Sequence, residues 1–510
     1  MQALPYAREV ALSALGALVL IFVVKQKRQR YLLPPGPSSL PLIGSLLSMP
    51  SEQEWKTYAE WGTIYGPISS VSVLGQRIVI VNSLQIAADI LDKRSAIYSD
   101  RPTLAFVSDC VGWCRAMVFR RYGPDFRTIR RLVHSVIGTP AAIRKFDRIE
   151  EEEVHGFLKR LLEKPEDFAD HIRHMTGAII LRISHGYRVR PQDDPFNKLA
   201  EDAMDKFSKA ASPRNFPANV LPFLLKLPEW FPGAEFKRTG RAWRATFDEM
   251  AELPFRLVKT QLANGTAEDS FASRMLEEKS GMSPEDEDLI KWAATSLHAG
   301  GADTTVASIH ALFRFMAMNP DAQAKAQAEM DEVVGTDRLP TIEDRERLPY
   351  VNALALEVLR AHAVAPTGVA HLLMKDDIYN GFFIPKGSLI VANLWQMLHE
   401  ENTYDRPNDF RPERFLAGEG RTPEKDPRTI CFGFGRRICP GKELADVSLF
   451  LACAAVLSVF NIRKWKEDGV EVDPIEGQTS GTVSHPWPFK CIIVPRSEKA
   501  AALIQSDNYA

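Results

Sequence analysis

Cysteine is scarce in this sequence, which has six cysteines in a chain of 510 residues. They are scattered, and none forms the Cys-x-x-Cys pair of a zinc site. This spacing excludes the disulfide framework of a small secreted protein, and we expect most of these thiols to be buried and reduced. The positions are Cys110, Cys114, Cys431, Cys439, Cys453 and Cys491.

An excess of charge of one sign is also missing. The chain carries 63 basic and 65 acidic residues, a formal net charge of -2. No overall positive field would therefore attract a polyanion, and we expect no nucleic-acid partner. Linkers rich in Gly and Ser, low-complexity tracts and repeats are absent too. The simplest interpretation is one large globular domain after the first 30 residues.

The amino terminus departs from the pattern of a soluble protein. Val10 to Val24 is apolar and uncharged, and four basic residues follow within "KQKRQR". This run is shorter than the roughly 20 residues of a full crossing, so a buried helix and a cleaved signal peptide are the alternatives. We expect residues 1–30 to form a single transmembrane anchor and residues 31–510 to form the domain, on the cytosolic side. The prolines of "LPPGP", Leu33 to Pro37, end the helix.

The rest of the sequence predicts a mainly α protein with a minor β region. Two β-rich runs flank a short turn within Ile68 to Ser83, and further strand signals lie between Val369 and Val391. Helical periodicity dominates elsewhere. The clearest helical stretches are Ser83 to Arg94, Asp288 to Met318, Pro320 to Val334 and Lys442 to Phe460. The acidic run Glu150 to Glu153 is interpreted as a solvated helix face without a function.

One cysteine stands in an unusual context, "FGFGRRICPG", which ends at Gly441. A thiolate that ligates iron needs an exposed sulfur, amide donors and nearby positive charge. Gly435 permits a tight turn, Gly441 permits close approach before the next helix, and Arg437 offers a charged donor. Phe432 is placed to shield the sulfur from water. The alternative is a structural cysteine, Cys439, buried in a glycine-rich turn.

These positions match F-x-x-G-x-R-x-C-x-G, so the chain resembles the cytochrome P450 family and its haem-binding signature. The resemblance implies the cytochrome P450 fold and haem b, with Cys439 as the axial thiolate ligand of the iron. It implies that the cofactor is contacted by Phe432, Gly435, Arg437, Cys439 and Gly441.

A second segment, Leu297 to Ile309, lies in a long apolar helix and resembles the oxygen-activating G-G-x-D-T-T of the same family. A threonine hydroxyl can bond the carbonyl four residues back, so we expect Thr304 to bond Gly300 and bend the helix. Gly300 and Gly301 would let the backbone approach a flat cofactor. Asp303 would pass protons toward the oxygen that Thr304 holds. The alternative is a packing notch with a satisfied aspartate.

Two short motifs extend the resemblance. "EVLR", Glu357 to Arg360, matches E-x-x-R, and "RPERF" matches P-E-R-F at Arg414. The i, i+3 spacing puts Glu357 and Arg360 on one helix face, where Arg414 would complete a buried ion network. The resemblance implies that this network holds the loop before the cysteine.

Two further residues would meet the haem carboxylates if the resemblance holds throughout. Arg130 matches the arginine of W-x-x-x-R, although Phe126 replaces the tryptophan and removes a possible indole hydrogen bond. His371 stands where the family carries an arginine or histidine directed at a propionate. A histidine at the surface or at a β-edge is the alternative.

The sequence is similar to fungal secondary-metabolism monooxygenases of the O-methylsterigmatocystin oxidoreductase type. The resemblance implies a membrane-bound enzyme, in the endoplasmic reticulum, that inserts one oxygen atom from O2 into a small hydrophobic substrate. No G-x-G-x-x-G unit or flavin module is visible, so electrons would come from an NADPH-cytochrome P450 reductase. Candidate docking residues are Arg127, Arg131, Arg436 and Lys442. The alternatives are a haem-thiolate isomerase or dehydratase and a non-enzymatic haem-binding membrane protein.

Family analogy also places substrate contacts near Phe106, His298, Gly368 and Thr482. The proline-broken segment Asn215 to Gly233 carries several large apolar side chains. We expect it to make a second membrane contact, whereas the alternative is that it packs inside. The residues expected to touch lipid are Phe223, Leu224, Leu225, Trp230 and Phe231.

Overall fold

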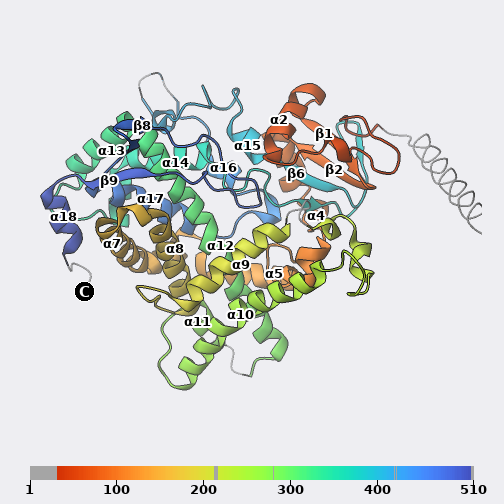
Figure 1. Cartoon of the computed structure of the whole chain (residues 1–510), viewed down its shortest axis with the longest axis horizontal. Helices are drawn as coiled ribbons and strands as arrows, with labels where there is room; N and C mark the ends of the chain where they lie inside the picture. The colour runs from red at the N-terminus through yellow and green to blue at the C-terminus, as the bar shows by residue number, and fades with distance from the viewer. Residues whose placement is uncertain (1–31, 212–215, 279–280, 419, 421, 507–510) are drawn as a thin grey trace, which may run out of the picture. The chain divides into compact units, whose positions relative to one another are not determined.

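Helices make up most of the structure, a computed structural model, and small sheets of four, two and three strands accompany them (Figure 1). The structure describes residues 32–211, 216–278, 281–418, 420 and 422–506. The chain divides into two compact units, Met1–Pro102 with Thr367–Asn393 (unit 1) and Thr103–Pro366 with Leu394–Ala510 (unit 2). The mainly α class with minor sheets is therefore confirmed.

Unit 1 is built around the four-stranded sheet, in the order β1-β2-β6-β3. The expected hairpin is present, and Ile68 pairs with Val81 in antiparallel register. Leu74 and Gly75 both have positive φ, which suits the tight turn of a two-residue hairpin. The parallel pairing of β2 with β6 joins Ile78 to Leu389, so chain segments far apart in sequence share the sheet.

The elements of unit 1 are η1 (Leu46–Ser48), α2 (Glu54–Tyr65), β1 (Ile68–Val73), β2 (Gln76–Val81), α3 (Leu84–Ala87), η2 (Ala88–Lys93), α4 (Ser95–Tyr98), β3 (His371–Leu372), β4 (Asp377–Tyr379), β5 (Phe382–Ile384) and β6 (Leu389–Ala392).

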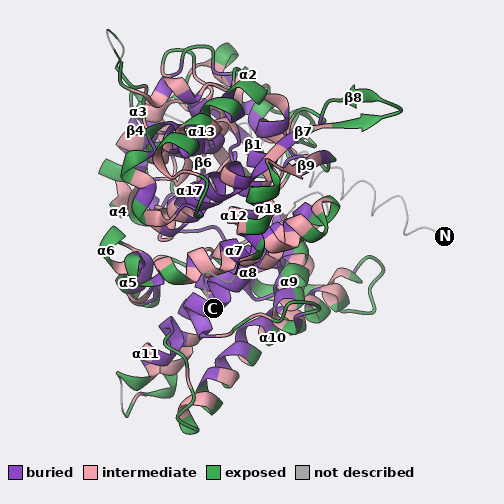
Figure 2. Cartoon of the chain, turned by 90° about the vertical axis from the view of Figure 1, so that its left-hand side faces the viewer, coloured by how far each residue is buried: buried purple, intermediate pink, exposed green. Residues whose placement is uncertain are grey.

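Unit 2 is organised around α12 (Pro284–Met318), which contacts α8, α5, α10 and α17. Ser283 caps this helix by accepting a hydrogen bond from the Asp286 amide at 3.1 Å, and Pro284 follows at its first position. Much of α8 and α12 is buried, as Figure 2 shows in purple. The packing of α12 against α8 favours glycine at position 301, because a Cβ there would lie 2.7 Å from the Ile180 side chain.

The helices of unit 2 before the cysteine loop are η3 (Phe106–Cys110), η4 (Trp113–Arg115), α5 (Pro124–Ile137), α6 (Pro140–Ile143), η5 (Arg144–Phe146), α7 (Asp147–Glu163), η6 (Pro165–Asp167), α8 (Phe168–His185), α9 (Pro195–Ala211), η7 (Pro217–Asn219), η8 (Pro222–Lys226), α10 (Phe236–Ala263), α11 (Phe271–Glu277), α12, α13 (Pro320–Val333), η9 (Ile342–Arg347), α14 (Pro349–Ala361), α15 (Leu394–Leu398), η10 (Pro412–Phe415) and α16 (Arg428–Cys431). The remaining elements are η11 (Gly435–Arg437), α17 (Lys442–Val459), β7 (Phe460–Glu467), β8 (Val470–Val472), β9 (Cys491–Pro495) and α18 (Glu498–Gln505).

The acidic run on α7 is not the solvated face that its sequence predicts. Glu150 is 1% exposed, and one of its oxygens accepts a hydrogen bond from Ser448 of α17 at 2.7 Å. Glu152 and Glu153 both accept hydrogen bonds from Arg182 of α8, at 2.8 and 2.9 Å. The prediction failed because helix packing covers this run, and four adjacent residues cannot all lie on one face of a helix.

The expected transmembrane anchor, residues 1–30, lies outside the described residues. In the part of the chain that the structure describes, no helix combines the length and the apolar composition needed to cross a bilayer.

Candidate functional site

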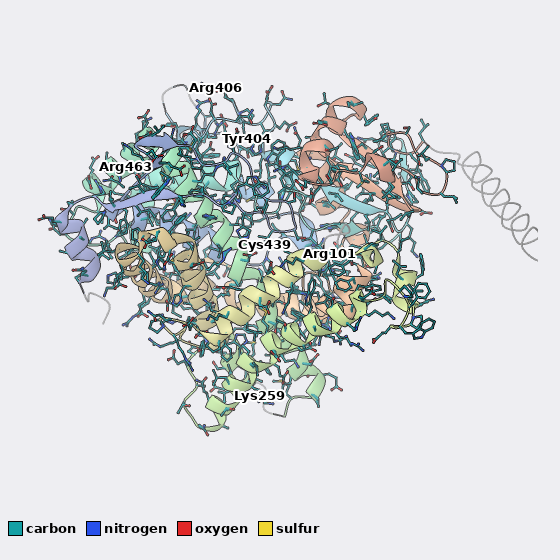
Figure 3. All side chains as sticks on the ribbon, in the orientation of Figure 1. Arg101, Lys259, Tyr404, Arg406, Cys439 and Arg463 are labelled. Atoms are coloured by element: carbon teal, nitrogen blue, oxygen red, sulfur yellow. The ribbon has the colours of Figure 1, made fainter. Side chains whose placement is uncertain are left out.

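The cysteine loop of unit 2 carries Cys439, which Figure 3 labels. The loop is closed by a hydrogen bond from the Cys439 amide to the Phe432 carbonyl at 2.8 Å. Gly435 has a φ of +60°, so the predicted tight turn does require glycine. Gly441 was expected to permit a close approach that a side chain would block. A Cβ there would meet only ordinary contacts, 3.6 Å from Ile137 and 4.0 Å from the Cys439 sulfur.

The surroundings of the Cys439 sulfur change the pKa of its thiol in opposite directions. Burial raises the pKa of the Cys439 thiol above its ordinary value. The Gly441 amide, which donates a hydrogen bond to the sulfur, and the charges of Arg130 and Lys442 act to lower this pKa. For Cys431, by contrast, burial raises the pKa and the neighbouring acidic groups raise it further. Cys439 is thus the cysteine of this loop that has an amide donor and two positive charges near its sulfur.

Of the two arginines predicted to bind the cofactor, Arg437 belongs to this loop and Arg130 reaches it from α5. The Arg130 guanidinium, from α5, donates a hydrogen bond to the carbonyl of Ile438, next to the cysteine. Arg437 is buried, stacks at 3.6 Å on the ring centroid of Phe126, and donates to the carbonyl of Arg120 at 2.7 Å. Phe126 therefore supplies a surface for Arg437 where the family motif has tryptophan. Cofactor contacts by either arginine stay predictions.

The oxygen-activating segment lies in the middle of α12. Its Thr304 hydroxyl donates to the Gly300 carbonyl at 2.7 Å, which confirms the predicted bond. A Cβ on Gly300 would meet no atom within 4 Å, although the flanking turns of α12 are buried. This open face fits a flat group placed against the helix. Gly301 instead faces Ile180 of α8. Of the two glycines, Gly300 therefore leaves the space that was predicted for a flat cofactor, and Gly301 does not.

Asp303 faces a partner that the motif did not reveal. Its Oδ1 lies 3.1 Å from the Nε2 of His485, which belongs to the segment before β9. Both side chains are partly exposed. The aspartate is therefore paired, as a carboxylate within an apolar helix must be to avoid a large desolvation cost.

The predicted ion network is present and larger than expected. Glu357 accepts hydrogen bonds from Arg360 at 2.8 Å and from Arg414 at 3.2 Å, and all three side chains are almost fully buried. A fourth member, Glu424, accepts from Arg414 at 2.7 Å. The i, i+3 spacing identified Glu357 and Arg360, but no local signal marks Glu424.

The other predicted contacts have surroundings of their own. His371 belongs to unit 1, where its Nδ1 lies 2.7 Å from the Tyr98 carbonyl oxygen, and its role at a propionate stays a prediction. His298 is fully buried and faces His185 of α8, with ring centroids 6.0 Å apart. The ring of Phe106 is covered by Phe216 at 3.7 Å. His298 therefore packs against α8, and a substrate contact near it stays a prediction.

A basic hollow lies beside the cysteine loop, with a volume of about 360 Å³. Arg436 donates to the Tyr122 hydroxyl at 2.7 Å, and the Arg127 guanidinium lies 5.8 Å from the same ring. The lining residues are Tyr122, Phe126, Arg127, Arg130, Arg131, His134, Gly435 and Arg436. The hollow gathers three of the four residues predicted to dock a redox partner, Arg127, Arg131 and Arg436.

A helical protein with a glycine-bounded cysteine loop and a central helix whose Thr304 hydroxyl bonds the Gly300 carbonyl has features expected of a haem-thiolate enzyme. The cytochrome P450 family model matches residues 34–493. Over 494 residues, the chain is 47% identical to cytochrome P450 monooxygenase claR of Ampulloclitocybe clavipes, covering 96% of this chain and 92% of that protein. It is 48% identical over 494 residues to cytochrome P450 monooxygenase 208 of Postia placenta, covering 96% of each.

A third relative, cytochrome P450 monooxygenase ppsD of Aspergillus oryzae, is 39% identical over 498 residues, covering 96% of this chain and 94% of that protein. The chain therefore belongs to the cytochrome P450 family, and it is an oxidoreductase of the monooxygenase class.

Proposed function

We propose that this enzyme inserts one oxygen atom from O2 into a small, mostly hydrophobic molecule of fungal secondary metabolism, with electrons from an NADPH-dependent reductase. The observation that carries the proposal is the cysteine loop, which is closed by the bond from the Cys439 amide to the Phe432 carbonyl and flanked by the Arg130 bond to Ile438. The Gly441 amide and the charges of Arg130 and Lys442 oppose the rise that burial gives to the pKa of the Cys439 thiol, and the thiolate is the form that ligates iron. The proposed setting is the endoplasmic reticulum membrane, with residues 1–30 as anchor.

The residues around the cysteine suit haem b. Cys439 would hold the iron, Phe432 would shield the sulfur, and Arg130 and Arg437 would offer charge to the propionates. Gly300 would leave room for the macrocycle against α12, because no atom lies within 4 Å of its Cβ position. When bound, the haem supplies dioxygen binding and activation, and a thiolate ligand favours O–O cleavage.

Asp303 and Thr304 would handle protons on α12. The Thr304 hydroxyl donates to the Gly300 carbonyl, so its oxygen lone pairs remain free to accept a hydrogen bond from the open side. The Asp303 carboxyl is partly exposed and can exchange protons with solvent. Together they would carry a proton from solvent to the open face of Gly300.

The test begins with the reduced carbon monoxide complex, which should absorb at about 450 nm if Cys439 binds iron as a thiolate. Cys439→Ser should abolish this band, and the matched control Cys431→Ser should keep it. A Cys439→Ser protein that keeps the band would contradict the assignment of the ligand.

The second part of the test is turnover. Membranes containing the protein and a reductase are incubated with terpenoids, polyketides and indoles, and product masses are measured. We expect a mass gain of one oxygen that requires NADPH. Turnover without NADPH would instead support an isomerase or dehydratase.

A further inference from the structure

The pair formed by Asp303 and His485 joins two elements that are distant in sequence. Asp303 comes from the middle of α12, and His485 from the segment 478–486 that precedes β9. Asp303 Oδ1 and His485 Nε2 are 3.1 Å apart, and the side chains are 22% and 19% exposed. Solvent therefore reaches the pair, but both side chains are mostly buried, so their interaction is stronger than it would be in bulk water.

The backbone around His485 is fixed in place. The His485 amide donates to the Thr479 hydroxyl oxygen at 3.0 Å, and the Thr479 amide donates to the His485 carbonyl at 2.8 Å. The Ser484 amide donates to the Val364 carbonyl at 2.8 Å, which ties the segment to the residues after α14. The imidazole is thus presented to α12 by a segment bonded on both sides.

The other ring nitrogen determines the tautomer. The Nδ1 of His485 is buried and has no hydrogen-bond partner. A proton on Nδ1 would be a buried donor without an acceptor, which costs more than leaving an acceptor unpaired on a neutral ring. The low-energy form is therefore the neutral imidazole with its proton on Nε2, donated to Asp303 Oδ1.

We propose that His485 is a positioning residue for Asp303. Its Nε2–H binds Oδ1 and fixes the orientation of the carboxyl group, so that Oδ2 is the oxygen left to take up a proton from water and release it beside Thr304. The proton enters and leaves at Oδ2, so His485 keeps its own proton and no charge accumulates. This inference rests on the proposed function, in which Asp303 carries protons.

The titratable groups near the pair do not offer Asp303 a second hydrogen-bond donor in place of His485. Burial lowers the pKa of His310 and of His362 to about 3, so both rings are neutral at neutral pH. Glu201 of α9 is exposed and repels Asp303 electrostatically. Two arginines complete the charged surroundings, Arg173 beside His310 and Arg314 beside His362.

The first experiment tests the pairing directly in the full-length holoenzyme. Hydrogen–deuterium exchange at the imidazole carbon, followed by mass spectrometry of peptides, gives an exchange rate for each histidine. Asp303→Asn should change the exchange rate of His485 by about twofold or more, because it removes the carboxylate that lies 3.1 Å from Nε2. The exposed His134 of α5 serves as the internal control, and its exchange rate should not change. An unchanged exchange rate at His485 would overturn the pairing.

The second experiment compares two substitutions of His485 by product formed per NADPH consumed. His485→Phe keeps a ring but loses the donor, and we expect coupling to fall about tenfold. His485→Gln can still donate to Oδ1 and should restore most of the coupling. Asp303→Asn combined with His485→Phe should be no worse than Asp303→Asn alone.

Equal losses in His485→Gln and His485→Phe, or additive losses in the double variant, would show that His485 only packs and would overturn the proposal. All variants should keep the carbon monoxide band, because neither residue touches Cys439. If the unmodified enzyme forms no product with NADPH, the proposed function fails, and the exchange experiment still decides the pairing.

Discussion

The Thr304 hydroxyl donates a hydrogen bond to the Gly300 carbonyl oxygen at 2.7 Å within α12. The hydroxyl shares an acceptor that a regular helix reserves for the backbone amide of residue 304, and such bonding bends helices locally. Gly300 has no atom near its Cβ position, so the shared carbonyl lies next to open space. The threonine is thereby oriented without any contact to Cys439.

Thr304→Ala should separate electron use from product formation. The substitution removes the hydroxyl and leaves the cysteine loop intact, so the carbon monoxide band should survive. NADPH consumption should continue while product falls about tenfold and hydrogen peroxide rises, because protons are no longer guided. Thr304→Ser, which keeps a hydroxyl able to reach Gly300, is the matched control. Unchanged product per NADPH in Thr304→Ala would contradict the role of Thr304.

The sequence predicted those parts of the site that local spacing defines. Thr304 and Gly300 are four residues apart, and Glu357 and Arg360 are three apart, so helix geometry alone brings each pair together. His485 and Glu424 could not be found in this way. Each reaches its partner through the tertiary fold, and a single histidine or glutamate in a loop has no periodic signal.

Tertiary packing, which the sequence does not reveal, also explains the wrong prediction at Glu150 and the different surroundings of Gly300 and Gly301. A run of acidic residues is usually solvated, and only the packing of α7 against α8 and α17 shows that Glu150 is covered. Gly301 is required by the Ile180 side chain, whereas Gly300 faces open space. The sequence motif contains both glycines and cannot show which one faces open space and which one packs against a neighbouring helix.

The basic hollow should control association with the reductase. Removing charge from the exposed Arg127 and Arg131 should raise the reductase concentration needed for half-maximal turnover about tenfold at low salt. The difference from the unmodified enzyme should shrink at high ionic strength, where surface charges are screened. The exposed Arg463, on β7, is the control, and Arg463→Ala should have no effect (Figure 3). A salt-independent loss in the double variant would point to misfolding instead of docking.

Arg414 should be essential for stability. Its removal leaves Glu357 and Glu424 with one partner fewer in a buried network, and we expect Arg414→Ala to lower the free energy of unfolding by about 3–5 kcal/mol. Lys325 pairs with the adjacent Glu413 at the surface, so Lys325→Ala should cost about 0–1 kcal/mol. Urea unfolding of both variants, monitored by circular dichroism, provides the comparison. Similar costs for the two would show that the network does not stabilise the fold.

Glu150 should make stability depend on pH. Burial raises the pKa of this carboxyl from 4.5 to about 8 in the folded protein. Because the folded-state pKa is the higher one, the protonated carboxyl favours folding fully below pH 4.5, and this contribution is lost as the pH rises through about 8. Glu150→Gln stays neutral and its oxygen can still accept the Ser448 bond.

The melting temperature of Glu150→Gln should therefore exceed that of the unmodified protein by a margin that is largest at pH 9 and disappears near pH 4.5. Glu163→Gln, at an exposed position near the end of α7, is the control and should show no such margin. A margin for Glu150→Gln that does not change with pH would mean that Glu150 is ionised throughout.

The segment 216–233 exposes the aromatic residues predicted to touch lipid. Phe223 is 59% exposed, Trp230 is 81% exposed and Phe231 is 42% exposed, whereas Leu224 and Leu225 are half-buried. Aromatic side chains gathered in one segment suit the interface of a bilayer, where rings are partly buried and partly wet. We therefore predict that a chain lacking residues 1–30 still sediments with phospholipid vesicles.

Phe223→Glu combined with Trp230→Glu should release that shortened chain from the vesicles, because each charge would have to leave water to enter the interface. Ile475 is 63% exposed but lies outside this segment, between β8 and β9, so Ile475→Glu is the matched control and should not change binding. An intact carbon monoxide band would show that the variants remain folded. If the shortened chain is already fully soluble without detergent, the segment does not act as a membrane contact, and the aromatic exposure needs another explanation.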